Sequence, residues 1–147
     1  MKYFKFLVIV FLVFTFSACE KKSSTAVQEV HWDRDMCARC VMVVSDRHNT
    51  TQVINPDTGQ KYMFDDIGCM VLWFEDENVK WKDKAVIWIT DATTGKWIDA
   101  RKAFYDTENV TPMAYGFCAH ESKDTIKKGQ EIVDFNEVVK RVIKIGE

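Results

Sequence analysis

The segment KYMFDDIGCMVLWFE, residues 61–75, decides the fold, because it contains the end of a predicted β-hairpin followed by the apolar spacing of a helix. Its first four residues follow the turn NPDTGQ at 55–60, in which proline presets φ and glycine accepts a positive φ. Together with TQVI at 51–54 they predict a β-hairpin. From Ile67 onward, apolar residues recur three, four and seven positions later, which predicts a helix with one buried face. Asp65 and Asp66 are suited to cap this helix, because a carboxylate accepts the free N–H groups of a first turn.

Outward from this segment, the run AVIWIT at 85–90 predicts a buried strand and completes the order strand, strand, helix, strand. The remaining chain repeats this order loosely, with strands at 96–99, 114–119 and 131–133, a short helix at 122–128 and a final helix to 143. A further strand is predicted at 41–46, which is rich in valine. We therefore expect an α+β fold of two small strand-strand-helix-strand modules packed together, over residues 31–92 and 93–147.

The first 18 residues have the features of a secretory signal. Two lysines precede an apolar run of 11 residues, which is too short to span a membrane. The residues FSAC at 16–19 resemble a bacterial lipobox, in which Cys19 is acylated and becomes the first residue. Residues 19–30 then predict a tether, because they are polar and lack an apolar period. These features indicate a cell-envelope protein held to a membrane by lipid and facing the periplasm.

The charge and the cysteine content reduce the number of function classes that fit this sequence. Removing the signal leaves 18 basic and 22 acidic residues, so no excess of positive charge remains to bind nucleic acid. Besides Cys19, the chain has four cysteines, and an even number in an exported protein is typical of disulfides. We find no phosphate-binding glycine loop, nucleophile elbow or zinc-protease motif, so we expect a protein that is not an enzyme.

The segment MCARCVM, residues 36–42, concentrates soft ligands. The spacing of Cys37 and Cys40 suits a redox disulfide, half of a zinc site or a Cu(I) site. Met42 favours Cu(I), which accepts thioether ligands more readily than zinc does. On the predicted strand, Cys40 and Met42 would share one face.

Other candidate ligands lie further along the chain. Met113 follows the rigid Thr111-Pro112 turn in a polar loop. Cys118 and His120 would share a face of the predicted strand at 114–119. We interpret Cys69 as a buried core residue on the helix.

Three functions remain open from these residues. The first is a Cu(I) carrier that uses Cys40, Met42 and Met113, with Cys37 or His120 in addition. The second is a thiol–disulfide oxidoreductase that uses Cys37 and Cys40, although the strand-then-helix context of a thioredoxin motif is absent. The third is a structural zinc site made by the four cysteines at 37, 40, 69 and 118.

The chain resembles the nitrous-oxide-reductase accessory lipoproteins, the NosL family. The matching features are the lipobox Cys19, the segment CARCVM followed by SD at 45–46, the segment FDDIGC at 64–69, Asp91 with WIDA at 97–100, and TPM at 111–113. One departure is Val41, at a position where the family often has glycine.

The resemblance implies a fold of two strand-strand-helix-strand modules and Cu(I) as the bound ion. It places Cys40, Met42 and Met113 on the sulfur positions of the family. It also implies that the protein delivers copper during maturation of periplasmic nitrous oxide reductase, with the apo enzyme and an ABC-type transporter as partners.

Overall fold

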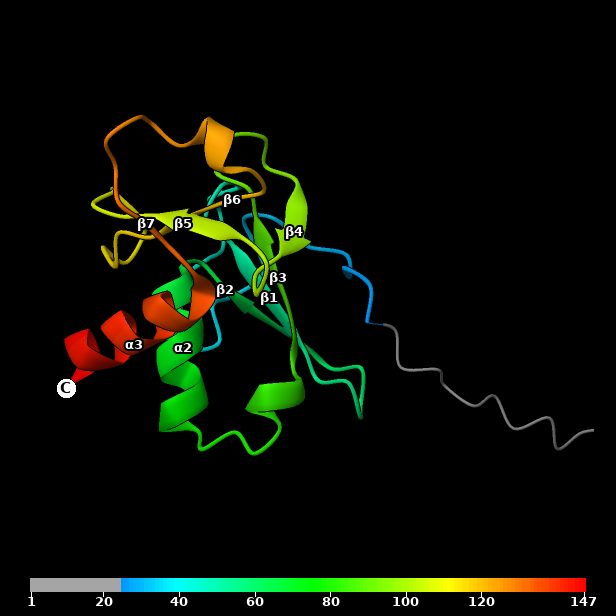
Figure 1. Cartoon of the computed structure of the whole chain (residues 1–147). Helices are drawn as coiled ribbons and strands as arrows, with labels where there is room; N and C mark the ends of the chain where they lie inside the picture. The colour runs from blue at the N-terminus through cyan, green and yellow to red at the C-terminus, as the bar shows by residue number, and fades with distance from the viewer. Residues whose placement is uncertain (1–24) are drawn as a thin grey trace, which may run out of the picture.

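The computed structural model describes residues 25–147. The predicted signal peptide and the lipid-bearing Cys19 lie outside this range. Within it, two helices accompany two antiparallel sheets of four and three strands, which confirms the predicted α+β class (Figure 1). No helix within these residues is both long enough and apolar enough to cross a membrane.

The larger sheet is built from the predicted hairpin and its neighbours. Strands β1 (Thr51–Ile54) and β2 (Lys61–Phe64) pair in antiparallel register, and β1 also pairs with β3 (Val86–Thr90). Helix α2 (Ile67–Asp76) lies between β2 and β3 in sequence, so the order strand, strand, helix, strand is confirmed. Strand β4 (Trp97–Asp99), placed in the second module by sequence, instead pairs with β3 and ends the first sheet.

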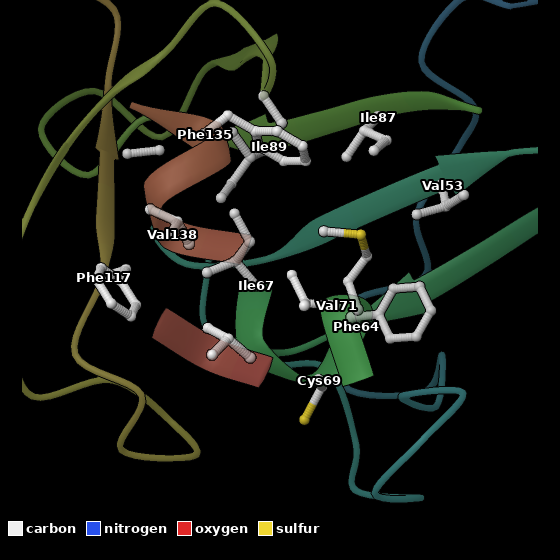
Figure 2. Close-up of a cluster of buried hydrophobic side chains, with 14 of the residues drawn as sticks. Val53, Phe64, Ile67, Cys69, Val71, Ile87, Ile89, Phe117, Phe135 and Val138 are labelled. Carbon is white, nitrogen blue, oxygen red and sulfur yellow. The ribbon is translucent and has the colours of Figure 1, made fainter. Parts of the chain in front are cut away.

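Side-chain alternation gives this sheet an inner face that packs on helices. Val53, Ile87 and Ile89 point inward and meet the buried face of α2, where Ile67 and Val71 lie (Figure 2). Met70 of α2 is buried in the same core. Helix α3 (Phe135–Gly146) packs beside α2 and contributes Phe135, Val138 and Val142 to the same core.

The smaller sheet has the strand order β6-β5-β7, formed by Cys118–His120, Phe104–Asp106 and Ile132–Val133. Along the chain, β5, β6, the 3₁₀ turn Lys123–Thr125 and β7 repeat the strand-strand-helix-strand order, with one turn in place of a full helix. A second 3₁₀ turn, Lys82–Lys84, precedes β3. The predicted strand at 114–119 is therefore shorter than expected and begins only at Cys118.

The predicted strand at 41–46 is wrong. Val41 has a φ of 61°, in the left-handed region that interrupts an extended chain. Residues 36–43 instead form a tight hairpin, closed by an isolated antiparallel bridge between Met36 and Val43. We call residues 36–43 the hairpin tip.

The first described residues cross the outer face of the larger sheet. The backbone N–H of Gln28 donates to the side chain of Gln52 at 2.8 Å, and the Gln52 amide donates back to the Gln28 carbonyl at 3.0 Å. The Trp88 indole donates to the carbonyl of Thr25 at 3.0 Å. This segment therefore shields the sheet on the side away from α2 and α3 (Figure 1).

Candidate metal centre

Four potential metal donors converge from separate parts of the chain. Cys37 and Cys40 come from the hairpin tip, Asp65 from the link between β2 and α2, and Cys69 from the first turn of α2. Their sulfur and carboxylate oxygen atoms all lie within 4.8 Å of one another. We call these four residues the sulfur site.

The hairpin tip is closed by its own backbone and fixed to the sheet. The N–H of Cys37 donates to the carbonyl of Met42 at 2.8 Å, and the N–H of Val41 donates to the carbonyl of Cys37 at 3.0 Å. The backbone N–H of Ala38, the residue after Cys37, donates to the carbonyl of Met63 in β2 at 2.8 Å. The tip therefore holds Cys37 against the edge of the sheet, where the thiol is 1% exposed.

The start of α2 positions the other two donors. Asp66 is the N-cap, and its carboxylate accepts from the N–H of Gly68 at 3.0 Å, as its position in the sequence predicts. Cys69 follows within the first turn. Its sulfur points away from the apolar side chains of the core (Figure 2). Cys69 is completely buried and belongs to the hydrophobic core, as the sequence predicts, while its sulfur also lies among the donors of the sulfur site.

The charges in the sulfur site are unevenly distributed. The pKa of the Cys37 thiol is lowered to about 4, chiefly because its sulfur accepts a hydrogen bond from Cys69 and also from backbone N–H groups of the tip. Donating that hydrogen bond, together with burial, raises the pKa of Cys69. Burial raises the pKa of Cys40 to about 11. The site therefore concentrates negative charge on one central sulfur while its two neighbours keep their protons.

Asp65 is a buried hydrogen-bond acceptor in the sulfur site, 3% exposed. The Cys40 thiol donates to its two carboxylate oxygens at 3.5 and 3.6 Å. Burial, and then the neighbouring Cys37, raise the pKa of Asp65 to about 6. Binding of a cation would lower the raised pKa values of Asp65, Cys40 and Cys69. The thiols would then release their protons, because a metal binds thiolate rather than thiol.

The Thr111-Pro112-Met113 loop is fixed beside the sulfur site. The Thr111 hydroxyl and the N–H of Met113 both donate to the Asp66 carboxylate, at 2.6 and 3.2 Å. The Tyr115 ring lies against Gly68, where a Cβ atom would approach the ring to 2.1 Å. Glycine is therefore required at this point of α2 for close packing. The Tyr115 hydroxyl also accepts from Arg39 of the hairpin tip at 3.4 Å.

The structure places only some of the predicted ligands in the sulfur site. Cys37 and Cys40 lie in the sulfur site. The backbones of Met42 and Met113 are hydrogen-bonded to Cys37 and Asp66, so both methionines lie at its border. Met42 is 51% exposed and does not share a strand face with Cys40, because Val41 turns the chain.

His120 and Cys118 lie outside the sulfur site. The His120 ring is buried, with Nδ1 at 3.0 Å from the Thr125 hydroxyl and Nε2 at 3.4 Å from Asp106. The Cys118 thiol donates to Asn49 at 3.2 Å. A zinc site formed by all four cysteines is therefore not assembled.

Of the four donors, Asp65 is in none of the ligand sets predicted from sequence, and Cys69 is only in the zinc alternative. Asp65 was interpreted as a helix cap and Cys69 as a core residue. The signal that links them is the spacing Asp65-Asp66-x-x-Cys69: once Asp66 caps the helix, Asp65 and the third helical residue both lie at its N-terminal end.

These features define a class: an α+β protein with a buried cluster of three thiols and one carboxylate, of the kind that holds a thiophilic metal ion. The sequence model of the NosL family matches residues 29–141, so the chain belongs to the NosL family. A search of the curated proteins gives no match.

A solved structure has a similar fold. The crystal structure of the copper chaperone NosL from Shewanella denitrificans superimposes with a TM-score of 0.64 at 12% sequence identity. The match covers 78% of this chain and 96% of that one. At this identity the likeness supports the fold.

Proposed function

We propose that this protein is a Cu(I)-binding chaperone of the bacterial cell envelope that delivers copper for the maturation of nitrous oxide reductase. The observation that carries the proposal is the sulfur site, with three thiols and a carboxylate within 4.8 Å. Membership of the NosL family and the copper-chaperone neighbour support copper as the ion.

Cys37, Cys40 and Cys69 are the proposed principal ligands. Thiolates select Cu(I) over hard cations, and three of them surround a single position. Met42 and Met113 border the site and are proposed as thioether donors that join during loading or release. His120 is left out of the ligand set, because its two ring nitrogens face Thr125 and Asp106.

The arrangement suits a carrier more than a permanent store. Cys37 and Cys69 are buried, whereas Cys40 is half-buried and lies on the hairpin tip. An incoming sulfur ligand can reach the ion from the Cys40 side, so copper can be bound tightly and still be exchanged.

The anchoring and the partners come from the sequence. The lipobox at Cys19 supports attachment to a membrane, on which the protein would meet an ABC-type maturation transporter and apo nitrous oxide reductase. The folded domain begins close behind this cysteine, which is compatible with a protein that works at the membrane surface.

The decisive experiment is a Cu(I) titration of the reduced protein against a competing chelator. We expect Cys69→Ser to lower the affinity at least 100-fold, because it removes a central thiolate. The matched control is Cys118→Ser, which removes a cysteine outside the sulfur site and should leave the affinity within threefold. Equal effects of the two substitutions would contradict the proposed site.

Zinc is the second candidate, because Asp65 places a carboxylate among the thiols and Zn²⁺ accepts oxygen as well as sulfur. Asp65→Asn discriminates between the ions. A copper site based on sulfur should keep its affinity, whereas a four-coordinate zinc site should lose at least tenfold. Competition titrations with both ions measure this directly.

A further inference from the structure

Apolar side chains are exposed mainly on the hairpin tip. Among the described residues, seven large hydrophobic side chains are exposed, and four of them lie within eight consecutive residues: Met36, Val41, Met42 and Val43. Their exposed fractions run from 43% to 67%. The other three, Val110, Ile132 and Ile145, are scattered over the rest of the chain.

Apart from the buried sulfur of Cys37, the same hairpin tip carries no unpaired charge. Arg39 is the one charged residue between positions 36 and 43. Its guanidinium donates to the Asp76 carboxylate at 2.8 Å and to the Tyr115 hydroxyl at 3.4 Å, so its charge is compensated inside the protein. A partner that is electrostatically complementary to this surface must itself be neutral there.

Val41 adds a second, independent feature. Its φ of 61° is unfavourable for a β-branched residue, and its side chain is 67% exposed. The side chain therefore costs conformational energy without being buried in the free protein. Strain of this kind points to a role outside the fold.

The sulfur site lies directly behind this surface. Cys37 and Cys40 belong to the hairpin tip, and Cys40 is the more exposed of the three clustered thiols. A ligand that takes the ion reaches it most readily at Cys40, which the exposed Val41 and Met42 follow directly in the chain.

We propose that the hairpin tip is the docking surface for the protein that exchanges copper with this one, and that the partner presents a neutral, apolar patch around a soft sulfur donor. The inference rests on the proposed function. It adds the chemistry of the partner and predicts an encounter driven by apolar burial rather than by long-range charge.

The exchange needs no change of oxidation state. The partner's sulfur forms a bond to Cu(I) while a bond from Cu(I) to one cysteine breaks, and the step repeats until the ion has moved. Cys40 and Cys69 regain their protons as they lose the ion, from the acceptor where its sulfur is a thiol and from water where it is a thioether. Exclusion of water by the apolar contact keeps the ion from being lost during these steps.

The test measures transfer of Cu(I) from the loaded protein to two acceptors: the purified maturation transporter together with apo nitrous oxide reductase, and a small chelator that needs no docking. The variants are Val41→Asp and Val43→Asp. Aspartate tolerates the left-handed conformation at position 41 better than valine does, so the tip should remain folded. The matched control is Ile145→Asp, whose side chain is 61% exposed on α3.

We expect the tip variants to slow transfer to the protein acceptors at least tenfold and transfer to the chelator less than twofold. Ile145→Asp should change neither rate, and wild-type transfer should vary less than twofold between 50 and 500 mM salt, about the range over which the Debye length falls from 14 to 4 Å.

Three results would overturn the proposal: unchanged transfer to the protein acceptors in both tip variants, equal slowing toward the chelator, or steep loss of transfer with salt. Absence of transfer from the wild-type protein would also overturn it. The proposed function fails separately, if the reduced wild-type protein does not bind Cu(I) in the chelator competition.

Discussion

Two regions of the molecule bring cysteine together with other potential ligands, and they do so in different ways. In the sulfur site, residues from three separate segments meet, and their thiols contact mainly one another and Asp65. In the smaller sheet, Asp106, Cys118 and His120 share one face, because Asp106 pairs with Cys118 and His120 lies two residues further on. We call this second group the β5–β6 face.

The side chains of the β5–β6 face have other partners. Asn109 donates to Asp106 at 2.7 Å, Cys118 donates to Asn49, and His120 lies against Thr125. On this face, Nε2 of His120 alone is buried without a hydrogen-bond partner among the described residues, 3.4 Å from the Asp106 carboxylate. This face therefore offers a metal ion one free nitrogen, not a cluster of converging donors. The comparison teaches that spacing in the sequence can identify side chains on a shared face. A metal site needs more: donor atoms that lie close together and that other groups of the protein do not already occupy.

The first test of this comparison uses two aspartates, each of which accepts hydrogen bonds from a loop distant in sequence. Asp66 fastens the Thr111 loop beside the sulfur site, and Asp91 accepts from the N–H of Glu121 at 2.8 Å beside the β5–β6 face. Replacing either by alanine removes several buried hydrogen bonds and should lower the free energy of unfolding by about 3 kcal/mol. Urea denaturation measures this loss.

The two substitutions should differ in their effect on the metal. Asp66→Ala frees the N-terminal end of α2, which carries Cys69, and should lower the Cu(I) affinity at least tenfold. Asp91→Ala should leave the affinity unchanged. Equal affinities in the two variants would show that the sulfur site does not depend on the packing of the Thr111 loop.

A smaller effect is expected at Asp65, whose pKa is raised from 3.8 to about 6 by burial and by Cys37. The folded protein therefore holds this proton more tightly than the unfolded chain. Stability should fall as the pH rises from about 4 to 6, and the loss should persist above pH 6.

The substitution Asp65→Asn removes this pH-dependent loss of stability, because asparagine does not titrate. At pH 7 we expect the variant to be more stable than the wild type by about 2 kcal/mol, somewhat less than the roughly 2.7 kcal/mol of a full two-unit pKa shift. Below pH 4 the advantage should vanish. Denaturation curves from pH 4 to 8, with the exposed Asp33→Asn as control, give the comparison, and an advantage independent of pH would contradict the assignment.

The smallest effect is expected at the hairpin tip. Val41→Gly relieves the left-handed strain at φ 61° and should stabilise the protein by about 1 kcal/mol. The Cu(I) affinity should stay the same, because the backbone of the tip is kept. Thermal denaturation detects the gain; a loss of stability would mean that the Val41 side chain has contacts that hold the tip in place.

Much of the fold could be predicted from the sequence because local signals agree with it. The turn at 55–60 specifies the β1–β2 hairpin, and the cap Asp66 with the apolar spacing from Ile67 specifies α2; both elements are confirmed. The strand at 41–46 failed because a valine-rich run favours strands locally, whereas the hydrogen bonds of Cys37 close a hairpin around a left-handed Val41.

The candidate site could be predicted only in part. Cys37 and Cys40 were found because their spacing is a local pattern. Asp65 is not predicted as a ligand, and Cys69 is predicted only in the zinc alternative, because their convergence depends on how β2 delivers the start of α2 to the hairpin tip. Such contacts between distant segments leave no periodic signal in a single sequence.

The hydrogen bonds of Thr25 and Gln28 to the larger sheet set the range over which the protein could act. They extend the folded body almost to the predicted acylation point and leave five residues, 20–24, between Cys19 and Thr25. Even fully extended, the chain between Cys19 and Thr25 spans at most about 20 Å. An acylated Cys19 would therefore confine the domain to a thin layer above the bilayer, where its effective concentration toward a membrane-bound transporter is high and its access to distant targets is low.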